Sequence, residues 1–405
     1  MRALTPESPS EMSPFRLALF WLGIQAVWGA LLGVSLQART TELSSGNAQI
    51  ATNELATAGA FVAAIVQILI GILADVRRRS GSRRIEFYAF GAIGGAIALV
   101  SFYDARTFAA LTVAFIGLQA TLNVAIGPYQ AIIPDFIEGR RLGVASSWMA
   151  ALQSAGNAIG ALCASFITNA RVLGASLSAL LLTTFVVTAT HVRGSTLQPS
   201  QDVGARVQIT RPFVDLFISR ALVYIGFYTL LFNLFFYVQS VLGASTIANA
   251  KQLTGILIVS FTIVGAAGAA LAARPSDRAD KRLVASLGGA GFIMALLLFI
   301  VSHGVAGAVA ATVIAGIGWG VFLVADWAIA CRVLPSGAMA SAMGVWNLAI
   351  VIPQVIAPAL TTWVLTHFAV SEPAVASRAA FALALAETVF GIAWLWRLPR
   401  KAIGN

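Results

Sequence analysis

The chain has 405 residues, of which 59% are hydrophobic and only 10% are charged, and its formal net charge is +10. A mean hydropathy of +0.86 excludes a soluble globular protein, because a soluble domain of this size cannot bury so much apolar surface. The sequence therefore predicts an all-α protein embedded in a lipid bilayer.

Apolar runs recur along the chain, and each is long enough to cross about 30 Å of hydrocarbon as a helix. An even number of such runs places both ends of the chain on one side of the membrane. The first fifteen residues lack a basic region and a small-residue cleavage site, so we expect no removable signal peptide. The runs predict twelve transmembrane helices, at residues 14–38, 51–74, 85–104, 107–133, 144–168, 171–190, 213–242, 252–273, 283–302, 305–334, 339–366 and 378–397.

The basic residues follow this arrangement of spans. Most Lys and Arg residues lie in the even-numbered loops and the C-terminal tail, whereas the odd-numbered loops hold only Arg39, Arg106, Arg171, Lys251 and Arg378. This asymmetry is the positive-inside bias, and it predicts that both termini are cytoplasmic. It also accounts for the net charge without a nucleic-acid partner. Short loops with few charges favour a bacterial inner membrane.

The longest polar stretch between spans, His191 to Arg211, divides the chain nearly at its middle. It predicts a six-helix bundle at 1–190, a cytoplasmic linker at 191–211 and a second six-helix bundle at 212–405. The end of span 4, from Tyr129 to Asp135, aligns with Asp326 to Arg332 in span 10, 197 residues later. Because many transporters are built from repeated bundles, we interpret the match as a six-plus-six duplication with pseudo-twofold symmetry.

A short acidic and basic loop follows span 2, and a similar one follows span 8. In the loop after span 2, Gly71 and Asp75 precede a cluster of arginines. In this arrangement the chain resembles the major facilitator superfamily. That family carries a Gly-x-x-x-Asp-Arg-x-Gly-Arg-Arg type signature there, with the first Arg one position earlier than Arg77. The resemblance implies the major facilitator fold and a secondary transporter.

Gly in this loop permits close helix approach, and a carboxylate at a helix end can pair with arginines to latch one conformational state. The alternative is that these arginines only determine topology. The expected gating residues are Gly71, Asp75, Arg79, Arg83, Arg84, Asp277 and Arg278.

Three further segments are similar to signatures of the glycoside and sucrose symporter group: Gln67–Asp75, Gly127–Asp135 and Gly344–Gln354. This narrower resemblance implies cation symport of a sugar. Positions 55–66 contain no carboxylate, which disfavours sodium coupling and leaves the proton as the expected coupling ion. Plant sucrose carriers have Arg where this chain has Gln130, which argues against sucrose itself.

In the family's architecture, spans 1, 4, 7 and 10 line the central cavity, and all four carry polar and aromatic residues at helical spacing. In span 1, Trp21 and Ser35 are predicted to share this face. Amides bind hydroxyls, and aromatic rings cover the apolar faces of a sugar, although amides also join helices in membranes. The expected substrate-binding residues are Gln25, Trp28, Gln119, Asn123, Arg220, Tyr224, Tyr228 and Trp319.

Three acidic or basic side chains lie well inside predicted spans, away from the span ends, where a charge costs about 2.5 kcal/mol or more. Arg220 and Asp326 lie at matching depths, so they predict an ion pair. The pair either couples transport to protons, with Asp326 neutralised when Arg220 turns to substrate, or forms a permanent structural bridge. Glu387, in span 12, is expected to be protonated or bonded to a neighbouring helix.

The chain contains no nucleotide-binding loop, zinc-ligand spacing or nucleophile elbow, which argues against an enzyme and against a cofactor or metal. A channel has no need of two repeated halves. The sequence therefore predicts a monomeric proton-coupled symporter, surrounded by membrane lipid, that moves a small solute such as a sugar or a similar polyhydroxylated compound. The alternative is a proton-driven exporter of lipophilic or drug-like compounds, which the Trp and Phe content favours.

Overall fold

The structure is a computed structural model that describes residues 12–79, 84–130, 132–137, 141–192, 209–333 and 339–400. Within these ranges the side chains of 75–79, 134–135, 142–143, 277–278, 339–345 and 347 are not described. The described residues form α-helices, one π-helix and short connections, with no β-strand among them.

Hydroxyl side chains mark where several of the helices begin. The side chains of Ser13, Thr107, Thr210 and Thr246 each accept a hydrogen bond from a backbone N–H of the following turn, which satisfies one of the otherwise unpaired donors of a helix start. The helices extend beyond the apolar runs: α10 covers Ile247–Arg278, whereas the predicted span was 252–273. Hydropathy identifies the part of a helix that suits hydrocarbon, whereas the polar capping residues decide where the helix itself begins.

Contacts divide the chain into two compact units. Unit 1 comprises Met1–Gly46 and Ala58–Gln201, and unit 2 comprises Asn47–Thr57 and Asp202–Asn405. Helix α3, Ala48–Arg79, therefore contributes its first turns to unit 2 and the rest to unit 1.

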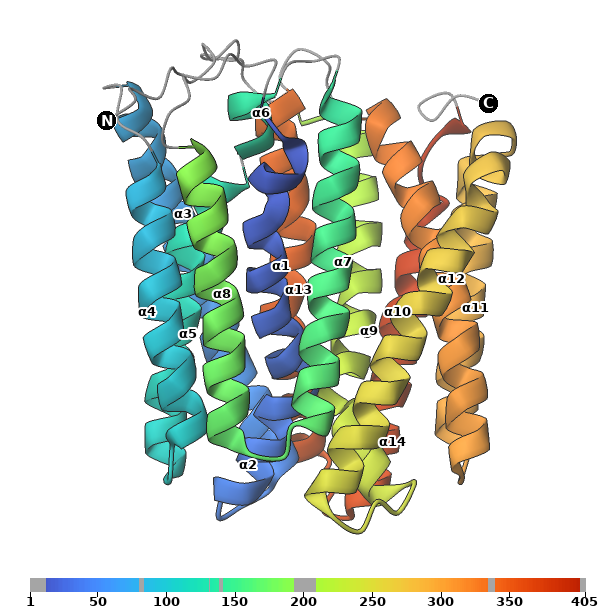
Figure 1. Cartoon of the computed structure of the whole chain (residues 1–405). Coiled ribbons are helices and arrows are strands. Elements are labelled where there is room, and N and C mark those ends of the chain that lie inside the picture. The colour runs from blue at the N-terminus through green and yellow to red at the C-terminus, as the bar shows by residue number, and fades with distance from the viewer. Residues whose placement is uncertain are drawn as a thin grey trace. The chain divides into compact units, whose positions relative to one another are not determined.

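Unit 1 is a bundle of long helices (Figure 1). Helix α1 packs against α7 and α8, and α4 packs against α5 and α8. Its elements are α1 Pro14–Ala30, the π-helix Leu31–Ser35, α2 Leu36–Leu43, most of α3, α4 Ile85–Asp104, α5 Phe108–Tyr129, α6 Ile132–Phe136, α7 Leu142–Phe166 and α8 Ala170–Val192.

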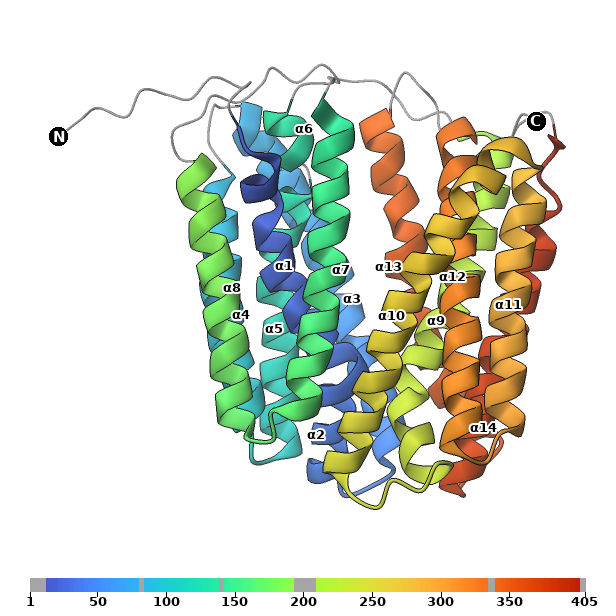
Figure 2. The ribbon, with the colours of Figure 1, turned by 45° about the vertical axis from the view of Figure 1, so that its right-hand side comes forward.

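Unit 2 is a second bundle, which Figure 2 shows from another side. Helix α9 packs against α13 and α14, α11 packs against α12 and α14, and α10 packs against α12. Its helices are α9 Arg211–Ser240, α10 Ile247–Arg278, α11 Lys281–Val301, α12 Val305–Val333, α13 Met339–His367 and α14 Pro373–Leu395.

The two units repeat one packing scheme. In unit 1 the first long helix packs against the fifth and sixth and the third against the fourth and sixth, and the corresponding four pairs recur in unit 2. The predicted duplication is thus present in the packing as well as in the sequence. Three pairs of equivalent helices begin 197 residues apart, at Pro14 and Arg211, Phe108 and Val305, and Leu142 and Met339.

Eleven helices among the described residues are long and apolar enough to cross a membrane. Helix α7, with 25 residues, supplies the twelfth long helix of the repeat. Large apolar side chains cover outward faces of the helices, including Ile263 and Leu271 on α10, which are 65% and 70% exposed. An apolar exposed face suits contact with acyl chains, so the chain is an integral membrane protein of the predicted all-α class.

Some helices approach each other through glycine. A Cβ added at Gly160 on α7 would overlap the carbonyl oxygen of Ala26 on α1, and one added at Gly320 on α12 would overlap the carbonyl oxygen of Gly265 on α10. Small residues let transmembrane helices pack backbone to backbone, and no larger residue fits at these two positions without a shift.

A π-helix interrupts the predicted polar face of span 1 at Ser35. The π-helix Leu31–Ser35 inserts a wider turn between α1 and α2, which rotates every later residue relative to the earlier ones. As a result the Ser35 hydroxyl accepts a hydrogen bond from Tyr103 of α4, with an O–O distance of 2.8 Å. The Gln37 side chain donates to the Leu32 carbonyl, which belongs to the widened turn, at 2.7 Å.

Candidate functional site

A buried ion pair lies in unit 2. Arg220 of α9 donates from Nη1 to Oδ2 of Asp326 on α12, and the two residues are 5% and 2% exposed. The predicted pairing of these residues is therefore present. Removing two charges from water is costly, and their attraction offsets this cost only while both partners remain.

Aromatic rings enclose the guanidinium of Arg220. Its Cζ lies 4.9 Å from the ring centroid of Tyr224 and 4.5 Å from that of Trp346 on α13. Nη2 donates to the Tyr224 hydroxyl at 3.4 Å. Cation–π contacts of this kind stabilise a desolvated cation, so Arg220 is held on three sides by α9, α12 and α13.

Two hydrogen-bond donors at this position are buried without a partner. Nε of Arg220 and the indole Nε1 of Trp346 have no acceptor among the residues that the structure describes. A buried donor without an acceptor costs about 1–3 kcal/mol. Such groups are uncommon in folded proteins, and they require an explanation.

Trp319 of α12 forms the centre of an aromatic cluster beside the ion pair. Phe227 stacks on it with centroids 4.4 Å apart and an interplanar angle of 16°, and Tyr224 meets it edge-on at 5.1 Å. The Tyr228 hydroxyl accepts a hydrogen bond of 2.9 Å from Gln354 of α13. Unit 2 therefore brings together four of the predicted substrate-binding residues: Arg220, Tyr224, Tyr228 and Trp319. Two residues that were not predicted, Trp346 and Gln354, lie against them.

A second polar network in unit 2 connects α3, α9 and α14. Gln49 and Asn53 donate to Oδ1 of Asn233 at 2.8 and 3.2 Å, and Asn233 donates to the Thr229 carbonyl at 2.7 Å. Thr229 in turn donates to Oε2 of Glu387 at 2.9 Å, whereas Oε1 is buried with no partner among the described residues. Glu387 is thus bonded to a neighbouring helix, as the sequence predicted.

The predicted amides of unit 1 bond to one another. Asn123 of α5 accepts from Gln67 of α3 at 2.6 Å and donates to the carbonyl and side-chain oxygens of Gln119 at 2.7 and 3.4 Å. These bonds favour a helix-joining role for Asn123. Gln25 and Trp28 of α1 are half-buried and form no hydrogen bond with described residues, and their substrate role stays a prediction.

The predicted gating residues are only partly visible. Asp75, Arg79, Arg83, Asp277 and Arg278 lie outside the described side chains. No described atom lies within 4 Å of a Cβ added at Gly71 itself. A Cβ added at Gly127 of α5 would lie 3.4 Å from the Gln67 carbonyl and 3.9 Å from the Gly71 nitrogen of α3, so the two helices approach each other at this point. The gating role of Gly71 stays a prediction. Arg84 is 8% exposed and precedes α4.

An acidic residue that was not predicted to act, Asp280, begins α11. It accepts from the backbone N–H of Arg282 at 3.0 Å and pairs with the guanidinium groups of Arg282 at 2.8 Å and Arg400 at 3.5 Å. The hydrogen bond from the Arg282 side chain lowers the pKa of Asp280 below its usual value. Arg282 also donates to the Leu398 carbonyl at 2.7 Å, which ties the start of α11 to the chain after α14.

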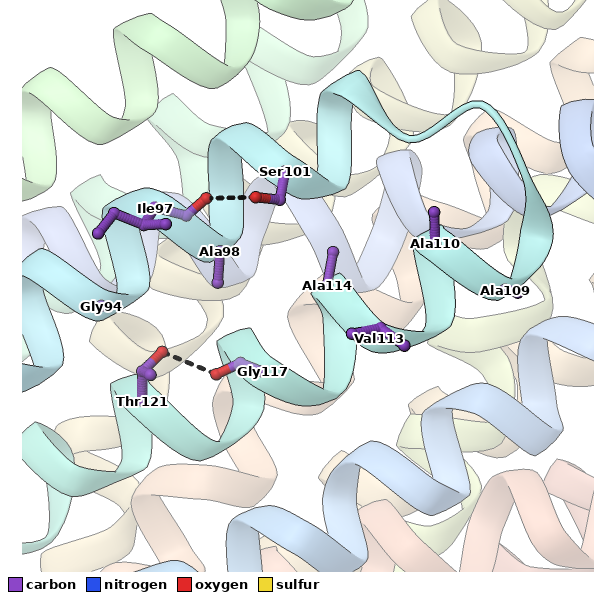
Figure 3. Close-up of a pocket in the computed structure, with 10 residues that line it drawn as sticks. All are labelled: Gly94, Ile97, Ala98, Ser101, Ala109, Ala110, Val113, Ala114, Gly117 and Thr121. Atoms are coloured by element: carbon purple, nitrogen blue, oxygen red, sulfur yellow. Dashed lines mark hydrogen bonds between the residues drawn. The ribbon is translucent and has the colours of Figure 1, made fainter.

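A groove on unit 1 lies between α4 and α5 (Figure 3). Its volume is about 700 Å³, and its lining is almost wholly apolar or small. The hydroxyls of Ser101 and Thr121 bond to carbonyls of their own helices, and Ile97 and Val113 are 64% and 73% exposed. The hydroxyl protons in the groove are thus already used within the helices, and the groove suits an apolar ligand better than a hydrophilic one. Nor do the described residues contain a cluster of three His, Cys, Asp or Glu side chains that could hold a metal ion.

The sequence of the chain matches one known protein family. The pattern described as Major Facilitator Superfamily matches residues 17–358 and again 250–404. The chain belongs to the major facilitator superfamily. No curated protein sequence matches it. The likeness to the glycoside and sucrose group that the sequence indicated is not established by these matches.

Solved structures of major facilitator proteins share the fold across nearly the whole chain. A bacterial homologue of the human lysosomal transporter Spinster, inward-facing and occupied, is 17% identical with a TM-score of 0.72 and covers 97% of each chain. The nucleoside transporter NupG is 14% identical with a TM-score of 0.69, covering 94% of this chain and 98% of its own. An auto-inhibited peptide transporter of the POT family is 11% identical with a TM-score of 0.71, covering 95% and 96%.

At these identities the likeness concerns the fold, so the site of this major facilitator protein rests on its own residues. Trp346, Gln354 and Gln67 lie within the segments Gly344–Gln354 and Gln67–Asp75 that carried the resemblance. Their polar side chains, in the second half of span 2 and within span 11, are the signal that could have identified them. They lie on spans 2 and 11, outside the four spans on which a polar face was expected.

Proposed function

We propose that this protein is a secondary transporter that carries a small polyhydroxylated solute, such as a sugar, together with a proton. The observation that carries the proposal is the buried ion pair between Arg220 and Asp326. An intramembrane charge is costly and is commonly retained for a transport function. The ion pair borders the aromatic rings of Tyr224 and Trp319, which suit the apolar faces of a sugar ring.

In the proposed cycle, Asp326 alternates between two states. As a carboxylate it neutralises Arg220, and after taking up a proton it releases the guanidinium to hydrogen-bond with the solute. A proton shifts the equilibrium between two conformations only by binding one of them more tightly. The exchange of partners on Arg220 supplies this difference in proton affinity, because Asp326 accepts the proton more readily when Arg220 is bonded to the solute.

The positive-inside bias supports an orientation with both termini in the cytoplasm of a bacterial cell. In that orientation, an acidic exterior favours inward transport of solute and proton. The arginine-rich loop after α3 and the equivalent loop after α10 are proposed to latch the cytoplasmic ends of the helices in one state.

Uptake of labelled sugars into membrane vesicles tests this proposal. A pH gradient, acid outside, should drive accumulation by the wild type, and Asp326→Asn should abolish the dependence on the gradient. Asp104→Asn is the matched control, because Asp104 pairs with Arg171 at 2.9 Å but its side chain is 46% exposed at a helix end. Equal gradient dependence in the Asp326→Asn variant and the wild type would refute the coupling role.

One observation favours the alternative of a proton-driven exporter of lipophilic compounds. Besides Tyr224 and Phe227, the rings of Phe261, Phe292 and Phe322 also lie within 6.4 Å of Trp319, measured between centroids. Such a cluster suits an apolar ligand. If no sugar accumulates under the gradient while a fluorescent lipophilic cation is expelled from loaded vesicles, the exporter is the correct function.

A further inference from the structure

The Arg220 position in unit 2 has more hydrogen-bond donors than acceptors. Of the guanidinium nitrogens, Nη1 donates to Asp326 and Nη2 donates to Tyr224. Nε of Arg220 and Nε1 of Trp346 are buried and have no acceptor among the described residues. A neutral sugar needs both donors and acceptors from its site, whereas two unpaired N–H groups beside a cation favour a ligand that only accepts.

The two donors belong to one site. The guanidinium lies over the face of the Trp346 ring, with Cζ 4.5 Å from the centroid, and Trp346 is 2% exposed. A carboxylate has two oxygens that can accept from the planar fork of an arginine, and arginine is suited to this geometry. An indole N–H can only donate, and it adds a partner for a carboxylate oxygen.

We propose that the transported solute is a hydroxylated organic acid of sugar size, such as a hexuronate, whose carboxylate binds Arg220 and the indole N–H of Trp346. This inference rests on the proposed transport function and narrows its substrate. Tyr228 and Gln354, joined by a hydrogen bond of 2.9 Å, supply both donors and acceptors for hydroxyl groups. Tyr224 links them to Arg220, since its ring lies 6.3 Å from that of Tyr228.

Charge balance then sets the coupling. In the structure Asp326 is the carboxylate partner of Arg220. When the carboxylate of the solute takes this place, Asp326 loses its cation and takes up one proton of the acidic external solution on its own oxygen, because an isolated buried carboxylate is strongly disfavoured. One monoanion and one proton enter together, so the transport step moves no net charge.

The acidic and basic side chains on the helices around Asp326 lie away from this exchange. The helices packed against α12 are α9, α10 and α11. On α10 these residues are Lys251 near its start and a group from Arg274 onward, and on α11 they are Lys281 and Arg282 at its start. On α9, Arg211 is the first residue and pairs at 3.9 Å with Asp215 in the second turn, which also accepts from the Trp394 indole at 3.2 Å. On α12 itself, Arg332 lies in the last turn. All of these lie near helix ends, whereas Arg220 and Asp326 lie further inside.

The test uses purified full-length protein in liposomes, with labelled D-glucuronate and labelled D-glucose. A pH gradient, acid outside, should drive accumulation of glucuronate, and clamping the membrane potential with potassium and valinomycin should leave the rate unchanged. Excess glucose should not compete. Trp346→Phe keeps the ring and removes the N–H, so the KM for glucuronate should rise roughly tenfold or more.

Trp363→Phe is the matched control, because Trp363 lies on the same helix as Trp346 but is 54% exposed. The KM of this variant for glucuronate should equal that of the wild type. Gradient-driven glucose uptake without uptake of, or competition by, glucuronate would overturn the acid as substrate while leaving proton-coupled transport intact. If neither compound is taken up, the proposed proton-coupled uptake is wrong. Thermal unfolding of the protein in detergent, with each compound added, then tests the carboxylate-binding site separately. Stabilisation by glucuronate but not by glucose supports an acid-binding site, and equal effects of both refute it.

Discussion

Gln49 of α3 and Asn233 of α9 form a buried hydrogen bond of 2.8 Å, although 184 residues separate them in the sequence. Asn53 donates to the same oxygen, so a single amide of α9 holds two side chains from the first turns of α3. These turns group with the helices of unit 2, whereas the remainder of α3 groups with unit 1.

Replacing Gln49 should weaken this arrangement. Gln49→Leu removes a buried amide bond, and interhelical bonds of this type contribute about 1 kcal/mol in membranes. We expect a lower midpoint of thermal unfolding in detergent. Gln252→Leu is the control, because Gln252 lies in the second turn of α10, is half-buried and forms no hydrogen bond with described residues. Equal losses in the two variants would contradict an energetic role for the amide cluster.

The ion pair predicts a double-mutant effect. Asp326→Leu leaves Arg220 buried without its carboxylate, so it should cost about 3–5 kcal/mol, and Arg220→Met should cost a similar amount. The double variant carries no buried charge, and it should recover most of that loss. Unfolding of the four proteins by denaturant measures the coupling. Additive losses would mean that the two side chains do not stabilise each other.

Two glycines differ sharply in what surrounds them. An added Cβ at Gly160 overlaps the backbone of α1, whereas one at Gly117 on α5 meets no described atom within 4 Å. Gly160→Ala should therefore destabilise the protein by about 1–3 kcal/mol. Gly117→Ala should be neutral or stabilise it by up to about 1 kcal/mol, because Ala favours the helix. Thermal unfolding of both variants checks the contrast, which fails if Gly160→Ala is as stable as Gly117→Ala.

Stability should depend on pH through Asp280. Its hydrogen bond from Arg282 lowers its pKa in the folded protein, so its contribution is present above the unfolded pKa of about 3.9 and is lost as pH falls through the lower folded-state pKa. Asp280→Asn keeps a capping side chain but loses the charge. We expect an unfolding temperature about 1–3 °C below that of the wild type at pH 7.

This difference should shrink toward zero as the pH falls from about 3.9 through the lower folded-state pKa, where the carboxylate of the folded wild type also takes up its proton. A difference between Asp280→Asn and wild type that is constant from pH 7 to pH 3 would contradict a charge effect.

The sequence by itself determined the membrane class, the twelve spans, the internal repeat and the pairing of Arg220 with Asp326. Each depends on a property that is local or periodic: hydropathy over about 20 residues, an offset of 197 residues, and two charges at equal depth in helices of known rise. The roles of the site residues in substrate binding, proton coupling and gating stay predictions, as does the division at the linker 191–211.

Only the tertiary structure decided which face of each helix meets which neighbour. The π-helix Leu31–Ser35 turns Ser35 toward Tyr103, and no hydropathy pattern announces one extra residue in a turn. Trp346 and Asn233 acquire their partners from helices more than 100 residues away in sequence. In a bilayer every span is apolar on most sides, so hydropathy fixes where a helix lies in depth, whereas its rotation and its neighbours follow from close packing and from the few polar groups that must find partners.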